Sequence, residues 1–220
     1  MINKFNFTVF FILFLTTINI AQNNSEFEGV IIFDMEMENE GMDPTSASMI
    51  NDLQTKIYIK GHLNRSEINS PLGNNITITD TKTNSYVNLM ELMGNKYLIR
   101  SNSEDIKNQE LMSKEIVIKY IDEKKEIAGF SCKKAEFYHP KEGSINVFYT
   151  EQFSNSAYDS RFKDLKGLPL EYEINQFGVK MVVTAKEVRK ELVDIKMFDI
   201  PGGYKETSQQ ELINLFEGKK

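Results

Sequence analysis

Hydrophobic and polar residues alternate with a period of two along most of the chain after residue 29. In residues 30–40 the apolar set is Ile31, Phe33, Met35 and Met37, and the acidic set between them is Asp34, Glu36, Glu38 and Glu40. Strict alternation is typical of a β-strand with one buried face and one face in water. Residues 30–40 are therefore predicted to form a strand with an acidic outer face.

The same period predicts an antiparallel meander in the first half of the chain. We expect strands at residues 56–68 (with a bulge at Gly61), 76–80, 86–92 and 96–100, joined by turns at 71–75, 82–84 and 94–95. Between residue 40 and this meander, Asp43 and Pro44 are suited to begin a short helix over residues 44–54.

The second half predicts a further set of strands at residues 116–121, 127–138, 145–152, 168–175 and 180–190, with hairpin turns at 123–125, 139–143 and 176–178. Residues 101–115 are polar and lack the period, which indicates a loop with a helical turn. The long connection 154–167 has room for a short helix, and an amphipathic helix over 208–217 is capped by Ser208 and ended by Gly218. The predicted fold class is mainly β (α+β), a single curved antiparallel sheet or half-open β-barrel with a few short helices.

The first 21 residues have the layout of a secretory signal peptide. Lys4 precedes an apolar run from Phe5 to Ile20, and Ala21 offers a small residue at the cleavage site. An uncleaved anchor is the alternative, but the run of about 16 residues is shorter than the roughly 20 that a spanning helix needs. The only cysteine is Cys132, so the signal is not that of a lipoprotein. We expect residues 22–220 to form one domain, periplasmic or secreted, that does not span a membrane.

Charge and cysteine content narrow the classes of partner. The net charge of −6 and the lack of a basic stripe argue against nucleic acid as a partner. A single cysteine cannot form an internal disulfide. Cys132 is expected to be a small buried residue, and pairing with another molecule is the alternative.

No set of residues predicts catalysis or a metal site. His62 and His139 are the only histidines, and neither lies beside a nucleophile motif, so we expect them to be solvated turn and strand residues. Carboxylates two apart on a strand are spaced about 7 Å apart and cannot by themselves enclose calcium. Met35 and Met37 have sulfur that suits copper, but they continue an apolar strand face. We predict no enzymatic activity, no metal and no cofactor.

An apolar face remains as the candidate ligand site. Methionine and aromatic side chains can line a pocket for an apolar ligand, or they can fill a core. The sequence leaves both open. The candidate residues are Phe33, Met35, Met37, Ile57, Ile59, Tyr97, Tyr149 and Tyr172.

Several stretches together resemble a known family of proteins. They are residues 127–134, 147–150, 166–170 (Lys-Gly-Leu-Pro-Leu) and 198–204 (Phe-Asp-Ile-Pro-Gly-Gly-Tyr). They resemble an uncharacterised family of exported Gram-negative proteins related to the GLPGLI family, although Leu170 stands where GLPGLI has its second glycine. The resemblance implies the LolA/LolB-like fold of lipoprotein carriers, a half-open barrel that holds acyl chains on its concave side.

Two functions follow as expectations. The first is a soluble exported binding protein that holds an apolar ligand, such as an acyl chain or lipoprotein lipid, on the concave face of its sheet. The alternative is a protein–protein interaction module of the cell envelope with a filled core and no ligand cavity. A fold hosts many functions, so the resemblance implies the fold better than the function.

Overall fold

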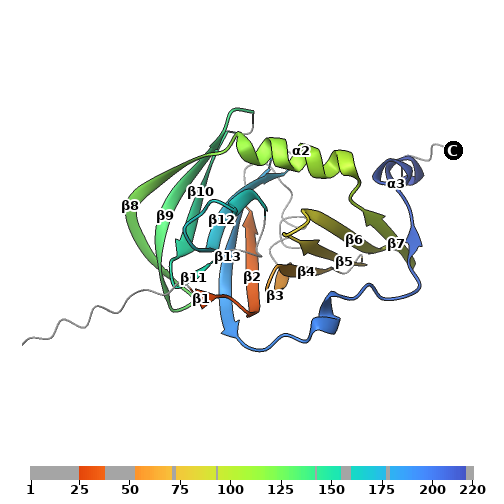
Figure 1. Cartoon of the computed structure of the whole chain (residues 1–220), viewed down its shortest axis with the longest axis horizontal. Coiled ribbons are helices and arrows are strands. Elements are labelled where there is room, and N and C mark those ends of the chain that lie inside the picture. The colour runs from red at the N-terminus through yellow and green to blue at the C-terminus, as the bar shows by residue number, and fades with distance from the viewer. Residues whose placement is uncertain are drawn as a thin grey trace, which may run out of the picture.

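One large curved sheet contains most of the protein (Figure 1). The computed structural model describes residues 25–37, 53–70, 73–92, 94–141, 143–154, 160–176 and 179–216. Twelve strands form the sheet in the order β14-β7-β6-β5-β4-β3-β2-β13-β12-β10-β9-β8. All neighbours are antiparallel except β14 and β7, and β8 and β14 are the two ends of an open sheet. The predicted mainly β class with a curved, open sheet is confirmed.

The elements of the sheet follow the alternating segments of the sequence. The strands are β2 (Gly29–Met37), β3 (Gln54–Lys60), β4 (Leu63–Ser70), β5 (Gly73–Asp80), β6 (Ser85–Leu92), β7 (Asn95–Arg100), β8 (Val117–Ile127), β9 (Phe130–His139), β10 (Gly143–Thr150), β12 (Leu168–Gln176), β13 (Val179–Lys190) and β14 (Lys205–Glu206). A separate pair joins β1 (Ser25–Glu26) to β11 (Phe153–Ser154). The helices are α2 (Ser103–Lys114) and α3 (Gln209–Phe216), with 3-10 turns η1 (Ser160–Phe162) and η2 (Ile195–Phe198).

The inner face of the sheet, defined as the face that bears Ile31, Phe33 and Ile57, contains the main core. In the half made by β2, β3, β13, β12, β10 and β9, this core buries residues from every strand, together with Phe162 and Leu165 from the segment around η1. Helix α2 crosses the open side of the curve (Figure 1). The inner face is therefore apolar and filled in this half of the sheet.

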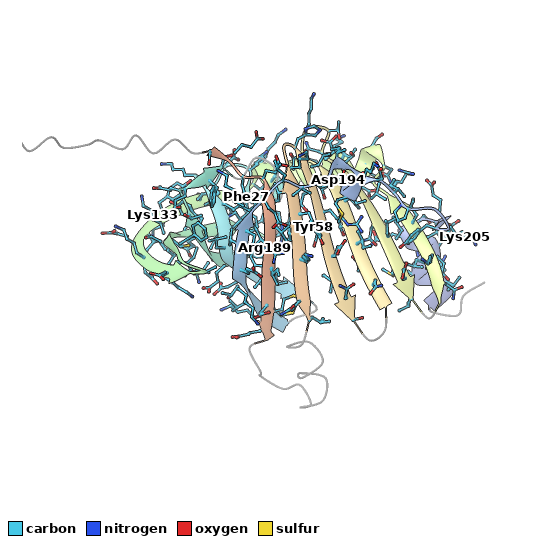
Figure 2. The ribbon with its side chains drawn as sticks, turned by 90° about the horizontal axis from the view of Figure 1, so that it is seen from below. Phe27, Tyr58, Lys133, Arg189, Asp194 and Lys205 are labelled. Atoms are coloured by element: carbon cyan, nitrogen blue, oxygen red, sulfur yellow. The ribbon has the colours of Figure 1, made fainter. Side chains whose placement is uncertain are left out.

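The outer face of the other half carries a second apolar cluster. Ile78, Leu89 and Leu98 of β5, β6 and β7 are buried there, with Phe198 and Tyr204 packed against them. Both aromatic residues belong to residues 191–206, which we call the C-terminal strap. Figure 2 looks onto this outer face, where Tyr58 of β3 and Asp194 of the strap are labelled. The first and last residues of the 198–204 stretch, Phe198 and Tyr204, thus pack against the sheet.

Two of the other three sequence landmarks are explained by local backbone geometry. Ala128 and Gly129 both have positive φ, at 48° and 81°, as a two-residue hairpin between β8 and β9 of the favoured handedness requires. Gly167 approaches the neighbouring strand so closely that a Cβ would lie 2.1 Å from the carbonyl oxygen of Thr150. Glycine is the residue that such an approach allows.

Three predictions of local structure are wrong. The hairpin expected at residues 123–125 lies at 128–129 instead, and the pairing of β8 and β9 shifts register between Ile121 and Lys124, so the charged stretch is an irregularity within a long strand. Residues 103–114 form helix α2 rather than a loop with one helical turn. Gly61 has a φ of 58° and lies in a tight turn between β3 and β4, not in a bulge.

The C-terminal helix is capped by Ser208 as predicted, and its predicted end at Gly218 lies outside the described residues. The Ser208 hydroxyl accepts a hydrogen bond from Glu211 N at 3.1 Å, and the Glu211 carboxylate accepts one from Ser208 N at 2.9 Å. This reciprocal arrangement is a capping box. The predicted signal peptide and most of the predicted helix over 44–54 lie outside the described residues, and of that helix Gln54 already belongs to β3.

Candidate functional site

Most of the predicted ligand-wall residues lie in one buried cluster. Phe33, Met35, Ile57, Ile59, Tyr149 and Tyr172 all belong to the main core and are at most 8% exposed. Met37 is the last residue of β2 and pairs with Met181. The structure does not describe its side chain. Tyr97 is half-buried on β7, in the other half of the sheet. The structure thus brings six of the residues together and separates Tyr97 from them.

Aromatic residues from a connecting segment fill the space in front of this cluster. Phe162 of η1 is fully buried, with its ring centroid 5.2 Å from that of Tyr172 and 5.4 Å from that of Phe137. The ring of Phe33 also lies edge-on to that of Tyr172, with their centroids 6.0 Å apart. The predicted ligand wall is therefore packed against the protein's own side chains.

The inner face becomes polar where the sheet passes from β3 to β4. Opposite residues in an antiparallel pair share a face, and the register places Ile57, Ser66, Thr77, Asn88 and Ile99 side by side across β3 to β7. Parallel to this row run Ile68, Asn75, Met90 and Tyr97 on one side and Asn64, Thr79 and Tyr86 on the other. We call Asn64, Ser66, Asn75, Thr77, Thr79 and Asn88 the polar patch.

Three side chains of the polar patch, those of Asn75, Thr77 and Asn88, are joined by hydrogen bonds. Asn88 donates from Nδ2 to Asn75 Oδ1 and to Thr77 Oγ1, each at 3.0 Å. Asn64 is 5% exposed, and the other members are half-buried. These bonds fix the relative orientation of two amides and a hydroxyl.

The polar patch is electrically neutral although the chain is rich in charge. By the register, none of the inner-facing residues of β4, β5, β6 or β7 in the described structure is Asp, Glu, Lys or Arg. The charged residues of these strands point to the outer face, where Arg65 donates to the carbonyl oxygen of Met197 at 3.0 Å and Lys96 lies 2.8 Å from Glu91. The two faces of one sheet thus differ sharply in charge.

Helix α2 begins over the edge of the polar patch. The Asn102 side chain caps the helix by accepting bonds from the backbone N of Glu104 and Asp105, at 2.8 and 3.0 Å. Burial, with a smaller contribution from the Asp105 carboxylate, raises the pKa of Tyr86 on the inner face. At the other end of the helix, Lys163 donates to the hydroxyl of Ser113 at 3.1 Å, which fastens α2 to the segment after η1.

Sequence reasoning missed the polar patch because its residues resemble an ordinary wet strand face. Asn, Ser and Thr alternate with Ile and Leu in β4, β5 and β6 just as Asp34 and Glu36 alternate with the core residues of β2. Only the register shows that the polar residues of the meander share the inner face with Ile57. A detectable signal was the lack of charge among them.

The histidines and the cysteine do not form a catalytic set in the described structure. His139 is buried rather than solvated as predicted, with Nε2 at 3.3 Å from a Glu115 carboxylate oxygen. His62 is exposed in the turn before β4, 3.8 Å from Asp80. Burial raises the pKa of the Cys132 thiol to about 11, and Cys132 is fully buried as predicted. Among the described residues, no group of three or more His, Cys, Asp or Glu could hold a metal ion.

A small hollow lies near the ends of β9 and β10. Its volume is about 110 Å³, and its lining includes Lys133, Thr150 and Glu151. Two of its lining residues, Lys133 and Glu151, form an ion pair at 2.6 Å. A space of this size holds a few water molecules and has no nucleophile with an adjacent base.

Comparison with known families identifies the chain. Residues 36–201 match the model of the N-glycanase peptide, N-terminal domain family. The chain belongs to this family. The match runs from the end of β2 to the strap, so it includes both the polar patch and the segments that fill the core. The relation to the GLPGLI family is not supported by this result and stays a prediction.

Solved structures show the same fold. PNGF-II is similar over 87% of this chain, with 16% identity and a TM-score of 0.54. This chain spans 33% of the length of PNGF-II. An uncharacterised conserved protein from Thermus thermophilus is similar over 86% of this chain and 93% of its own length, with 10% identity and a TM-score of 0.50. No curated protein matches the sequence.

In the described part of the chain, no helix is both long and apolar enough to cross a membrane.

Proposed function

We propose that this protein is a non-catalytic, exported binding domain that holds its ligand on the polar patch beneath α2. The observation that carries the proposal is the change of the inner face from a filled apolar core to a neutral, half-buried polar surface. Ligand sites commonly combine apolar walls with a few fixed polar groups. The polar patch offers both, because Ile68, Met90, Tyr97 and Ile99 flank it.

The name of the family supports a ligand that carries N-linked glycans. Its description names an N-glycanase, an enzyme that acts on N-linked glycans, and this chain matches the N-terminal domain. We assign recognition rather than cleavage to this chain, because none of the described inner-facing side chains of β4–β7 is Asp, Glu, Lys, Arg or His.

An acyl chain in the main core is the second candidate, favoured by the resemblance to lipoprotein carriers. Such a ligand would have to replace Phe162, whose ring already contacts Tyr172 and Phe137. The neutral surface with apolar flanks on β4–β7 needs no such displacement. We therefore place the ligand on the polar patch.

A blocking substitution tests the proposed site. Thr77→Tyr fills the centre of the polar patch, and Thr83→Tyr adds the same side chain in an exposed turn as the matched control. Calorimetric titration would use three probes: a glycoprotein with one N-linked glycan, the same protein freed of its glycan, and palmitate. We expect one probe to bind the native protein and the control but not Thr77→Tyr. Equal binding by all three proteins, or none by the native protein, would contradict the proposed site.

A further inference from the structure

We infer that the polar patch recognises a neutral oligosaccharide. This inference rests on the proposed function and adds the chemical class of the ligand. Three features of the inner face of β4–β7 support it: paired amides beside hydroxyl groups, tyrosine rings at its borders, and the lack of charged inner-facing residues.

The amide and hydroxyl pairing suits the hydroxyl groups of sugars. An asparagine side chain provides two N–H donors and an oxygen with two lone pairs, and a threonine hydroxyl both donates and accepts. The bonds from Asn88 to Asn75 and Thr77 fix three such groups within hydrogen-bond distance of one another. Neighbouring hydroxyls on a pyranose ring likewise donate and accept a few ångströms apart. The surface can therefore meet several sugar hydroxyls without moving its own side chains.

Two tyrosines border the patch on opposite sides. Tyr86 lies next to Thr79 across β6 and β5, and Tyr97 lies next to Met90 across β7 and β6. The face of an aromatic ring carries partial negative charge, and one face of a pyranose presents C–H groups with partial positive charge. A tyrosine ring can thus contact the apolar side of a sugar while the tyrosine hydroxyl makes a hydrogen bond.

Charge distinguishes a neutral sugar from other polar ligands. A phosphate or a sulfated glycan would need lysine or arginine, and the arginines of β4 and β7 point to the outer face. The net charge of −6 also repels anions, and the Asp105 carboxylate lies close to Tyr86. An uncharged ligand gains from the hydrogen bonds and does not require a counter-charge.

The test separates the class of ligand from the existence of the site. The titrated probes are the uncharged core pentasaccharide of N-linked glycans, the same core extended with sialic acid, palmitate and an uncharged peptide. Asn88→Ala removes the amide that joins Asn75 to Thr77, and Asn69→Ala removes an exposed asparagine from the outer face of β4 as the matched control. Circular dichroism verifies that each variant is folded.

We expect the pentasaccharide to bind with an affinity that changes little with salt, because neither partner needs ion pairing. Asn88→Ala should weaken binding roughly tenfold through lost hydrogen bonds, and Asn69→Ala should not change it. Binding of palmitate or the peptide alone, lost in Thr77→Tyr, would overturn the carbohydrate assignment and leave the proposed site intact. Absence of binding by every probe would contradict the proposed function itself.

Discussion

The ring of Phe162 packs against the ring of Tyr172, with centroids 5.2 Å apart. Tyr172 belongs to the face that the sequence predicts as a ligand wall, and Phe162 comes from the short turn η1. Through this contact, the protein's own side chain fills the space in front of Tyr172. One half of the curved sheet is closed by the chain itself, and the other half keeps a polar surface beneath α2.

Removing the Phe162 ring should open the main core. Phe162 is fully buried, so Phe162→Ala should lower the free energy of unfolding by about 3–5 kcal/mol. Denaturant unfolding measures this loss, with Asp164→Ala as a neighbouring control whose side chain is exposed. The variant should also take up a fluorescent fatty acid that the native protein excludes. Equal uptake by the native protein would show that the core admits an acyl chain without this change.

Gly167 should not tolerate a side chain. A Cβ there would lie 2.1 Å from Thr150 O, so β10 and the start of β12 would have to separate. We expect Gly167→Ala to destabilise the protein by about 2–3 kcal/mol, within the range for overpacking. Gly202→Ala is the matched control, because a Cβ at Gly202 meets nothing within 4 Å. Equal unfolding midpoints for the two variants would disprove this explanation of the glycine.

The contact between the strap and the sheet should weaken at acidic pH, when the Glu91 carboxylate becomes protonated. Lys96, and then the hydrogen bond from the Tyr204 hydroxyl at 2.8 Å, lower the pKa of Glu91 from its usual 4.5. A lowered folded pKa means that the ionised carboxylate stabilises the fold above the unfolded value, and that this contribution is lost as the pH falls through the folded value. At about pH 7, the native protein should therefore have a higher Tm than the Glu91→Gln variant.

The difference in Tm between these two proteins should disappear as the pH falls below 4.5. Thermal melts across this range measure it, with Glu36→Gln, on an exposed residue of β2, as the control for the change in charge. A difference that stays constant down to strongly acidic pH would show that the Glu91 carboxylate does not hold the strap through its charge.

Cys132 should be unreactive in the folded protein. Its thiol is fully buried, and burial raises its pKa to about 11, so little of the nucleophilic thiolate exists at neutral pH. A thiol-reactive chromogenic disulfide should label it fast in denaturant and slowly without it. Fast labelling of the native protein would instead support the alternative in which Cys132 pairs with another molecule.

Much of the fold is predictable from the sequence because period-two alternation is local. β2, β5 and β6 lie close to their predicted positions for this reason. The hairpin at Ala128 and Gly129 was missed because the charged residues 123–125 have the composition of a turn, whereas the true turn depends on positive φ at Ala128. Helix α2 was missed because its apolar residues do not form a clear stripe, and its start depends on the Asn102 cap.

The candidate site was less predictable than the fold. Alternation within each strand marks Phe33, Ile57 and Tyr97 as apolar-face residues, and the pairing between strands puts all three on the inner face. It could not show that Phe162 fills the space in front of Tyr172, because that contact joins η1 to β12. Nor could it show that Ser66, Thr77 and Asn88 form a row, because a row depends on register between strands.

The central claim is that the polar patch is where a ligand binds, and side-chain amide NMR tests it most directly. The Asn75 and Asn88 side-chain amides give their own signals, and each can be assigned by its loss in the Asn→Ala variant. Titration of the pentasaccharide into native protein should shift both signals and leave the Asn69 signal unchanged. Shifts confined to Asn69 or to the strap, with Asn75 and Asn88 unmoved at saturation, would contradict the account.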